Sequence, residues 1–300
     1  MNATVLRPAE RHYSGHVTRP ERWACWTPRT GDVLVSTPSK SGTTWTQSIL
    51  AMLIAGGPDL PQPVPVLSPW VDADLGVPAE TVAQDLKRQT GRRVVKTHTP
   101  GDGFPVWQDV PVIAVYRHPL DVFFSLRKHV ANQTTTDADH PMYQTLERSF
   151  ATYIEKTCAP DDIDHDSLEG FVLHLTATAL NAERTDVTTF HYSNMRADPR
   201  SAVAAMAKAA RIDADGALVD TVVQATAFDA MRNRAEMFTP VAGTGFWKDD
   251  RTFFDSASSR KWEGRLTATQ LARYTERLEE LIPDPAIRHW VENGGDLPGH

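Results

Sequence analysis

Residues 33–56 constrain the fold of this chain more than any other segment. Val33 to Ser36 has the pattern of a buried strand, a loop of small residues around Lys40 follows, and an apolar helical pattern runs on to Gly56. This order aims backbone N–H groups, the positive end of a helix dipole and a lysine charge at one point. The segment therefore predicts a binding site for a phosphate or sulfate group.

The loop differs from the Walker A loop of nucleotide-binding proteins. In that loop, G-x-x-x-x-G-K-[ST], the lysine follows the last glycine, whereas here Lys40 precedes Gly42. An ordinary ATP or GTP loop is therefore not expected. A plain strand-to-helix turn with an exposed lysine stays open as an alternative, so the other segments have to decide.

Length and composition restrict the class of protein. The chain has 300 residues, 41% of them hydrophobic, and no linker rich in glycine or serine. We therefore expect a single domain over residues 1–300, with a core of about 30–282 and an N-terminal cover of 1–30. In that cover we expect Trp23 and Trp26 to pack on the core, with an aromatic substrate wall as the alternative.

Charge and cysteine usage argue against several partners. The formal net charge of −7 is unlike that of nucleic-acid-binding proteins. Cys25 and Cys158 belong to no metal or disulfide pattern and suit a reducing compartment. No stretch approaches 18 consecutive apolar residues, and the N-terminus lacks an apolar signal region. We therefore expect a cytoplasmic protein that binds neither nucleic acid nor membrane.

Strand and helix patterns alternate along the chain. Further strands are predicted at 92–100, 112–117 and 187–192, and the proline-rich residues 56–78 are expected to lack regular structure. This alternation predicts an α/β fold of the P-loop type, with a central parallel sheet flanked by helices on both faces. Helices are predicted at 43–56, 78–90, 120–129, 143–158, 165–184, 217–225 and 267–281, and from Pro199 onward.

Polar residues follow the predicted strands in the same way. Lys40 lies after the first strand, Lys96 and His98 close the second, and Arg117 closes the third. Ligands of open α/β sheets bind beyond the carboxyl ends of the strands, so these side chains are expected to converge on one crevice. The acidic residues 162–166 have the alternate spacing of a calcium loop, but Ser167 and Leu173 do not fit it. A solvated helix start is expected there.

Three motifs carry a resemblance to a known family. P-S-K-S-G-T-T-W at 38–45, K-T-H at 96–98 and Y-R-H-P-L-D-V-F-F-S at 116–125 resemble motifs of the cytosolic sulfotransferases. Those enzymes use 3′-phosphoadenosine 5′-phosphosulfate (PAPS) as donor and release 3′-phosphoadenosine 5′-phosphate (PAP). The resemblance extends from about Val33 to Thr267, with looser matches at 191–195, 227–231 and 262–267.

The resemblance implies a donor site in three parts, and a catalytic group beside it. The 5′-phosphosulfate would be held by Lys40, Ser41, Gly42, Thr43 and Thr44, the 3′-phosphate by Arg117 and Ser125, and the adenine by Trp45, Tyr192, Thr226 and Phe228. His98 would be the general base on the acceptor hydroxyl, Lys40 would lie beside the leaving oxygen, and Lys96 would neutralise sulfonate oxygens.

Two family motifs are altered in this chain. Where family members carry an R-K-G triplet that contacts the 3′-phosphate, this chain has Asp255, Ser256 and Ala257; Arg260 and Lys261 are the candidate replacements, with ordinary surface cations as the alternative. The C-terminal dimer motif is represented only by Glu263, Thr267, Ala268 and Ala272, so the oligomeric state is not predicted.

The chemistry of sulfonate transfer agrees with this set of residues. The transition state spreads negative charge over peripheral and leaving oxygens, so fixed cations and backbone donors stabilise it. A histidine base suits the proton of an alcohol, and neither a metal nor a covalent nucleophile is required. We therefore predict transfer of a sulfonate group to a hydroxyl or amine. A non-catalytic nucleotide binder and an atypical P-loop kinase are the alternatives.

The acceptor is predicted only as a small molecule. Its site is expected between the proline-rich segment, residues 129–143 and residues 238–254. The last segment contains Phe246, Trp247 and Phe253. These aromatic residues favour an apolar or ring-containing acceptor, although packing in the core explains them equally well.

Overall fold

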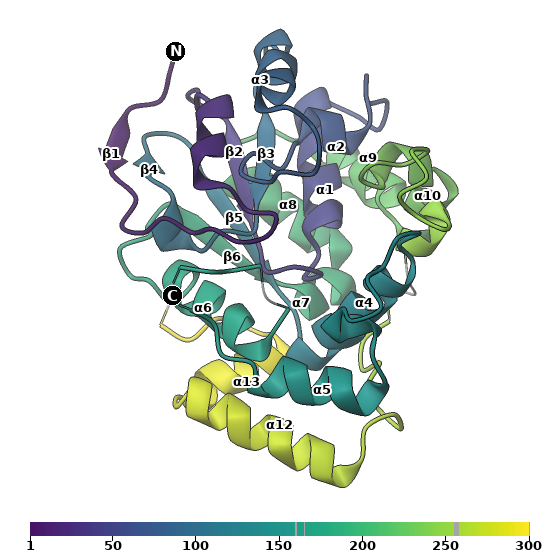
Figure 1. Ribbon diagram of the computed structural model, residues 1–300. Helices are drawn as coiled ribbons and strands as arrows, with labels where there is room; N and C mark the ends of the chain where they lie inside the picture. Colours follow the sequence, from purple (N-terminus) through teal and green to yellow (C-terminus); the bar gives the residue numbers. More distant parts are fainter. Residues whose placement is uncertain (160, 165, 255–257, 300) are drawn as a thin grey trace.

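A parallel sheet forms the centre of the molecule in the computed structural model, which describes residues 1–159, 161–164, 166–254 and 258–299 (Figure 1). Its four strands are ordered β3-β2-β5-β6, and every neighbouring pair is parallel. The carboxyl ends of the strands therefore meet at one edge, as predicted. Their bounds are Val94–Thr97 for β3, Val33–Ser36 for β2, Val112–Tyr116 for β5 and Val187–His191 for β6.

Alternate residues of the strands point to opposite faces, and both faces are covered. Val33 and Val35 pack with helices α1 (Thr43–Ala55), α8 (Pro199–Ala209) and α9 (Gly216–Ala225). On the other face, Leu34 packs with residues of the N-terminal segment, and Tyr116 packs with helices from the C-terminal half of the chain. The predicted α/β sheet with helices on both faces is thus confirmed.

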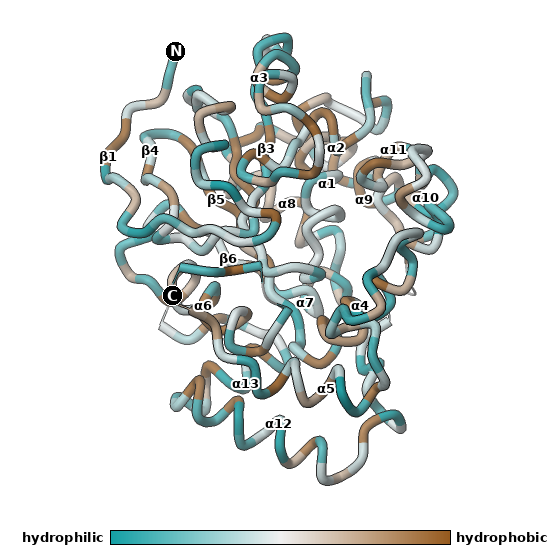
Figure 2. The backbone as a smooth tube through the Cα atoms, in the orientation of Figure 1, coloured by the Kyte–Doolittle hydropathy of each residue, from teal (hydrophilic) through white to brown (hydrophobic). Residues whose placement is uncertain are grey.

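The helices on the Tyr116 side form a second layer below the sheet in Figure 1. In Figure 2 the outermost of them, α12, alternates between hydrophilic and hydrophobic residues, as expected for a helix that buries one side, with Tyr274 and Leu278 inward. The helices of this layer are α4 (Pro119–Ala131), α5 (Leu146–Glu155), α6 (Leu168–Thr178), α12 (Ala268–Leu281) and α13 (Pro285–Asn293).

The N-terminal residues pack against the sheet. Trp26 is buried with Leu34 and Val112, and its indole lies 5.2 Å from that of Trp107. Packing on the core, rather than a substrate wall, therefore describes Trp26. A small antiparallel pair of strands, β1 (Val5–Arg7) and β4 (Val106–Trp107), lies beside this cover and was not predicted.

Several predicted elements differ from the structure. The proline-rich segment contains one helical turn, α2 (Val64–Leu67), because prolines are compatible with a first helical turn. The expectation of no regular structure there was wrong, the helices predicted at 143–158 and 165–184 are shorter, and α13 was missed. The remaining elements are α3 (Ala79–Arg88), α7 (Tyr192–Ala197), α10 (Phe228–Asn233), α11 (Ala235–Phe238), and 3₁₀ turns at Pro20–Cys25, Gly101–Gly103, Pro141–Tyr143 and Asp250–Phe253.

Within the described residues, no helix combines the length and the apolar character needed to cross a bilayer.

Candidate active site

The loop between β2 and α1 is shaped by two residues with left-handed backbone conformation. Lys40 has φ 61° and Gly42 has φ 116°. A Cβ atom on Gly42 would lie 3.1 Å from Cδ2 of Tyr192, so both the conformation and the space favour glycine. Helix α1 begins at the next residue, and no side chain caps its first turn within the described chain. Its N–H groups are therefore available to an anion.

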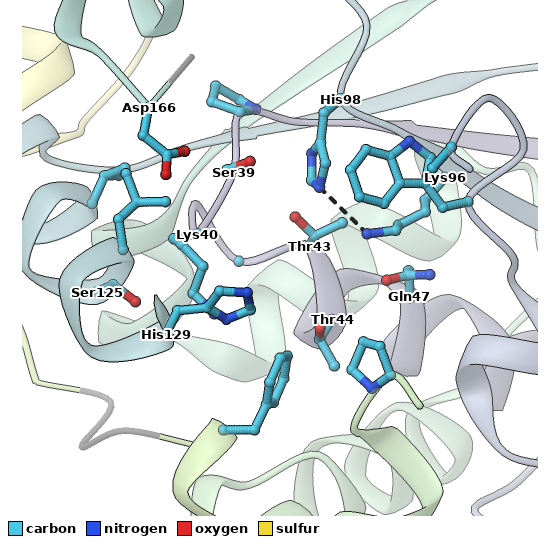
Figure 3. Close-up of a pocket in the computed structure, with 18 of the residues that line it drawn as sticks. Ser39, Lys40, Thr43, Thr44, Gln47, Lys96, His98, Ser125, His129 and Asp166 are labelled. Carbon is cyan, nitrogen blue, oxygen red and sulfur yellow. Dashed lines mark hydrogen bonds between the residues drawn. The ribbon is translucent and has the colours of Figure 1, made fainter. Parts of the chain in front are cut away.

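A cavity of about 1460 Å³ opens at this loop and reaches all four strand ends. Figure 3 shows Lys40, Lys96, His98 and His129 around its centre. The structure thus brings together most residues that the sequence assigned to the site. The predicted residues that line the cavity are Lys40, Gly42, Thr43, Thr44, Trp45, Lys96, His98, Arg117, Ser125, Tyr192, Thr226, Phe228 and Lys261.

His98 is held with one ring nitrogen toward the cavity. Its Nδ1 lies 2.6 Å from the carbonyl oxygen of Thr37, and because a carbonyl only accepts, Nδ1 carries the proton and donates. The lone pair is then on Nε2, 3.3 Å from Nζ of Lys96. Burial, and next the charge of Lys96, lower the pKa of His98 well below its usual value. His98 is therefore neutral at neutral pH.

Lys96 is a buried cation beside this histidine. Its ammonium lies 4.3 Å from the ring centre of Trp70, and burial lowers its pKa to about 8, although the charge of Asp72 opposes the shift. Asp72 in turn accepts hydrogen bonds from the hydroxyls of Thr97 (2.7 Å) and Thr99 (2.6 Å). The polar end of β3 is therefore anchored on both sides of His98.

A second lysine–histidine pair lies across the cavity. Nζ of Lys40 is 3.1 Å from Nδ1 of His129, which comes from the last turn of α4. The Lys40 ammonium also lies 4.6 Å from the ring centre of Phe253. Burial, and next the charge of Lys40, lower the pKa of His129 well below its usual value.

The predicted 3′-phosphate site contains a buried guanidinium. Arg117 lies over the ring of Tyr192, 4.4 Å from its centre, and donates from Nη2 to the carbonyl oxygen of Ser258 at 2.7 Å. Three buried polar atoms around the donor part make no hydrogen bond to described residues: Nε of Arg117, Nε1 of Trp45 and Oγ of Ser41. Buried polar groups are normally paired, so the two N–H groups fit a ligand that brings acceptors.

The predicted adenine site is lined by aromatic rings. The rings of Trp45 and Tyr192 are 5.6 Å apart in an edge-on arrangement, and Phe228 lies 6.5 Å from Phe254. All four line the cavity, together with the buried Thr226. Flat apolar walls of this kind suit a heterocyclic base.

Two residues that were predicted to bind the sulfonate donor lie outside the cavity lining. Ser41 is buried behind the loop, outside the cavity lining given by the described residues. The side chain of Arg260 is 71% exposed and pairs with Glu263 at 3.5 Å, so the surface alternative describes it. Backbone N–H groups of Arg260 and Lys261 instead donate to Asp121, at 3.0 and 2.8 Å. Asp255, Ser256 and Ala257 lie outside the described residues.

The sequence did not single out two cavity residues, His129 and Asp166. A helix follows the acidic residues 162–166 as expected, with Ser167 as its cap, but the side chain of Asp164 is not solvated: it is 8% exposed. Asp164 accepts hydrogen bonds from the backbone N–H of Thr18 at 2.6 Å. Asp166 lines the cavity (Figure 3), and burial raises its pKa to about 6. Neither position belongs to a short-range pattern that could have revealed it.

Fold and site together define an α/β protein of the P-loop type with an anion-binding loop and a histidine beside it. Residues 30–284 match the sulfotransferase domain family, so the chain belongs to that family and is a sulfotransferase. A glycolipid sulfotransferase of Mycobacterium tuberculosis is 31% identical over 91% of each chain. Sulfotransferase 2A1 of Macaca fascicularis is 22% identical over 84% of this chain and 85% of its own.

Solved structures share the fold. Mouse sulfotransferase SULT7A1 complexed with PAP superposes with a TM-score of 0.67 at 16% identity, over 92% of this chain and 93% of that chain. Retinol dehydratase in a complex with retinol and PAP superposes with a TM-score of 0.64 at 15% identity, over 85% and 82%. The predicted family and fold are thus confirmed.

Proposed function

We propose that this chain transfers the sulfonate group of PAPS to a hydroxyl group of a small molecule, with His98 as the general base. One observation carries the proposal: the lone pair of His98 Nε2 and the ammonium groups of Lys40 and Lys96 face the same cavity as the anion-binding loop. A base, two cations and oriented N–H donors are the groups that in-line transfer to a hydroxyl requires.

The chain's own residues fit the donor. Two buried N–H groups that make no hydrogen bond to described residues, Nε of Arg117 and Nε1 of Trp45, lie at the predicted phosphate and adenine contacts, and two structures of similar fold have PAP bound. Residues Gly42, Thr43 and Thr44 would hold the 5′-phosphosulfate at the start of α1, and Arg117 with Ser125 would hold the 3′-phosphate. Bound PAPS would donate its sulfonate group to the acceptor oxygen and would leave as PAP.

The proton and the charges are handled by three side chains. His98 accepts the proton of the acceptor hydroxyl on Nε2, because Thr37 occupies Nδ1. The lowered pKa of His98 keeps this nitrogen unprotonated in the donor-free site. A bound polyanion would raise the pKa of His98 toward the range in which a base works best. Lys96 faces the transferring oxygens, and Lys40 stabilises the charge that develops on the leaving oxygen.

We infer an amphiphilic acceptor with hydroxyl groups. Val64, Val66 and Leu75 line the cavity, so part of its wall suits an apolar body. The Asp166 carboxylate, an acceptor when ionised, suits hydroxyl groups. The 31% identity to a glycolipid sulfotransferase agrees with both features. We expect the reaction in the cytoplasm, where the free thiols of Cys25 and Cys158 stay reduced.

The test is transfer of labelled sulfonate from PAPS to a panel of glycolipids, sterols, phenols and amines. We expect product with at least one hydroxylic amphiphile and release of PAP. Tight binding of PAP without transfer to any acceptor would support a non-catalytic nucleotide binder instead. Magnesium-dependent turnover of ATP would support the kinase alternative, although β5 is followed by Arg117 rather than by the expected metal-binding aspartate.

A further inference from the structure

His129 lies at the point where the phosphosulfate loop and the end of α4 face one another. Its contact with Lys40 joins residues 89 positions apart at 3.1 Å. An ammonium group only donates, so Nδ1 of His129 accepts and its Nε2 carries the proton. The lowered pKa keeps the ring neutral. In this arrangement the lone pair of His129 is directed to Lys40, a residue of the anion-binding loop.

His129 also contacts residues other than Lys40. Its ring packs 4.8 Å from Trp247 and 5.9 Å from Phe253, in edge-on contacts. The residues after α4 are tied to the same aromatic segment: the side-chain amide of Asn132 donates to the carbonyl oxygen of Asp249 at 2.9 Å. The imidazole is therefore packed against aromatic rings as well as hydrogen-bonded to the lysine.

Lysine needs such a partner because its stem has four rotatable bonds, and fixing them costs conformational entropy. A carboxylate partner would neutralise the charge and compete with an anionic ligand. A neutral imidazole orients the ammonium and leaves its charge intact. Phe253 adds a ring face on which the same ammonium rests.

We propose that His129 is a positioning residue, which holds the Lys40 ammonium in the orientation that the donor's 5′ group requires. This inference rests on the proposed role of Lys40 in sulfonate transfer. It predicts that losing the acceptor nitrogen of His129 lowers kcat and PAP affinity more than changing the shape of its ring does. It also predicts that this loss disappears when Lys40 is replaced.

Two variants separate the nitrogen from the ring. His129→Phe keeps a flat ring against Trp247 but removes the acceptor, whereas the side-chain oxygen of His129→Asn can occupy the position of Nδ1. We expect His129→Phe to lower kcat about 10- to 100-fold and to weaken PAP binding, measured by calorimetry. His129→Asn should recover most of both. Equal losses in the two variants would overturn the inference.

A double-mutant cycle with Lys40→Met completes the test. In the Lys40→Met background, His129→Phe should change PAP affinity and kcat less than twofold. An undiminished effect in that background would assign His129 to the acceptor wall and overturn the positioning role. A wild-type protein that binds PAP but transfers no sulfonate overturns the proposed function instead, and the cycle in PAP affinity still measures the coupling of the two side chains.

Discussion

The two lysine–histidine pairs of the cavity use the same residue types with opposite proton placement. Lys96 and His98 lie two residues apart at the end of β3, and the carbonyl of Thr37 leaves the lone pair of His98 on Nε2. Lys40 and His129 come from distant segments, and the lysine occupies the lone pair of Nδ1. In both pairs the lysine ammonium lies at the lone pair of the ring. The pairs therefore differ in which ring nitrogen carries the proton, and the hydrogen-bond partners decide that tautomer.

The largest effect should come from removing the base of the first pair. His98→Ala should lower kcat about 10²- to 10⁴-fold, the usual contribution of a well-placed base, because no other described group places a neutral nitrogen beside Lys96. PAP affinity from calorimetry should change little. His129→Ala is the matched control, and a loss in that variant as large as in His98→Ala would erase the difference between the pairs.

Removing the cation of the second pair should come next. Lys40→Met keeps the length of the side chain but loses its charge, so kcat should fall about 10²-fold or more, the scale of losing one fixed donor to a developing oxyanion. Unlike His98→Ala, it should also weaken PAP binding, because Lys40 lies in the loop that holds the 5′ group. An unchanged rate would remove the loop from the mechanism.

The pH profile should report the first pair. Neutral His98 and charged Lys96 are the active forms. Because the pKa of His98 is lowered, kcat/KM should not fall until the pH is well below 6.5. Because burial lowers the pKa of Lys96 to about 8, kcat/KM should decline above that pH, about tenfold by pH 9 if the charge is essential.

Lys96→Arg sharpens this prediction, because a guanidinium keeps its proton at every pH of the assay. The alkaline decline should then move upward or disappear, whatever the absolute rate of the variant. A decline that stays near pH 8 in Lys96→Arg would show that another group titrates there.

The smallest effects should come from the rings under each ammonium. Trp70 lies 4.3 Å from Lys96 and Phe253 lies 4.6 Å from Lys40. Trp70→Leu and Phe253→Leu should each remove about 0.5–1 kcal/mol of cation–π stabilisation of the neighbouring lysine ammonium. This loss corresponds to a decrease of about two- to fivefold in kcat/KM. Trp70→Leu should also lower the pKa of the alkaline decline, and Phe253→Leu should leave it unchanged. If Phe253→Leu lowered this pKa and Trp70→Leu left it unchanged, the alkaline decline would belong to Lys40 rather than to Lys96.

The first pair was accessible from the sequence, and the second was not. K-T-H at the end of an apolar run places Lys96 and His98 by strand geometry alone, and the parallel order of the strands follows from their continuous apolar character. His129 lay in a segment assigned only to the acceptor wall. Its role depends on how the end of α4 packs against residues 240–254, and no local pattern encodes such packing.

Two further positions that the sequence did not place have similar physical causes. Arg260 is next to the predicted Lys261 in sequence, but its left-handed backbone, φ 59°, accompanies a side chain directed to solvent. Asp166 belongs to the acidic stretch for which solvation was expected, but the N-terminal cover contacts Asp162 through Ser14 and Asp164 through Thr18. Long-range packing decided each of these positions.

Nitrogen NMR of the imidazole rings in the donor-free protein tests the contrast between the pairs most directly, because the shifts of Nδ1 and Nε2 report which nitrogen carries the proton. At pH 7.5 we expect His98 as the Nδ1–H form and His129 as the Nε2–H form, and we expect only His129 to respond to Lys40→Met. The same tautomer at both positions, or protonated rings, would contradict this account of the site.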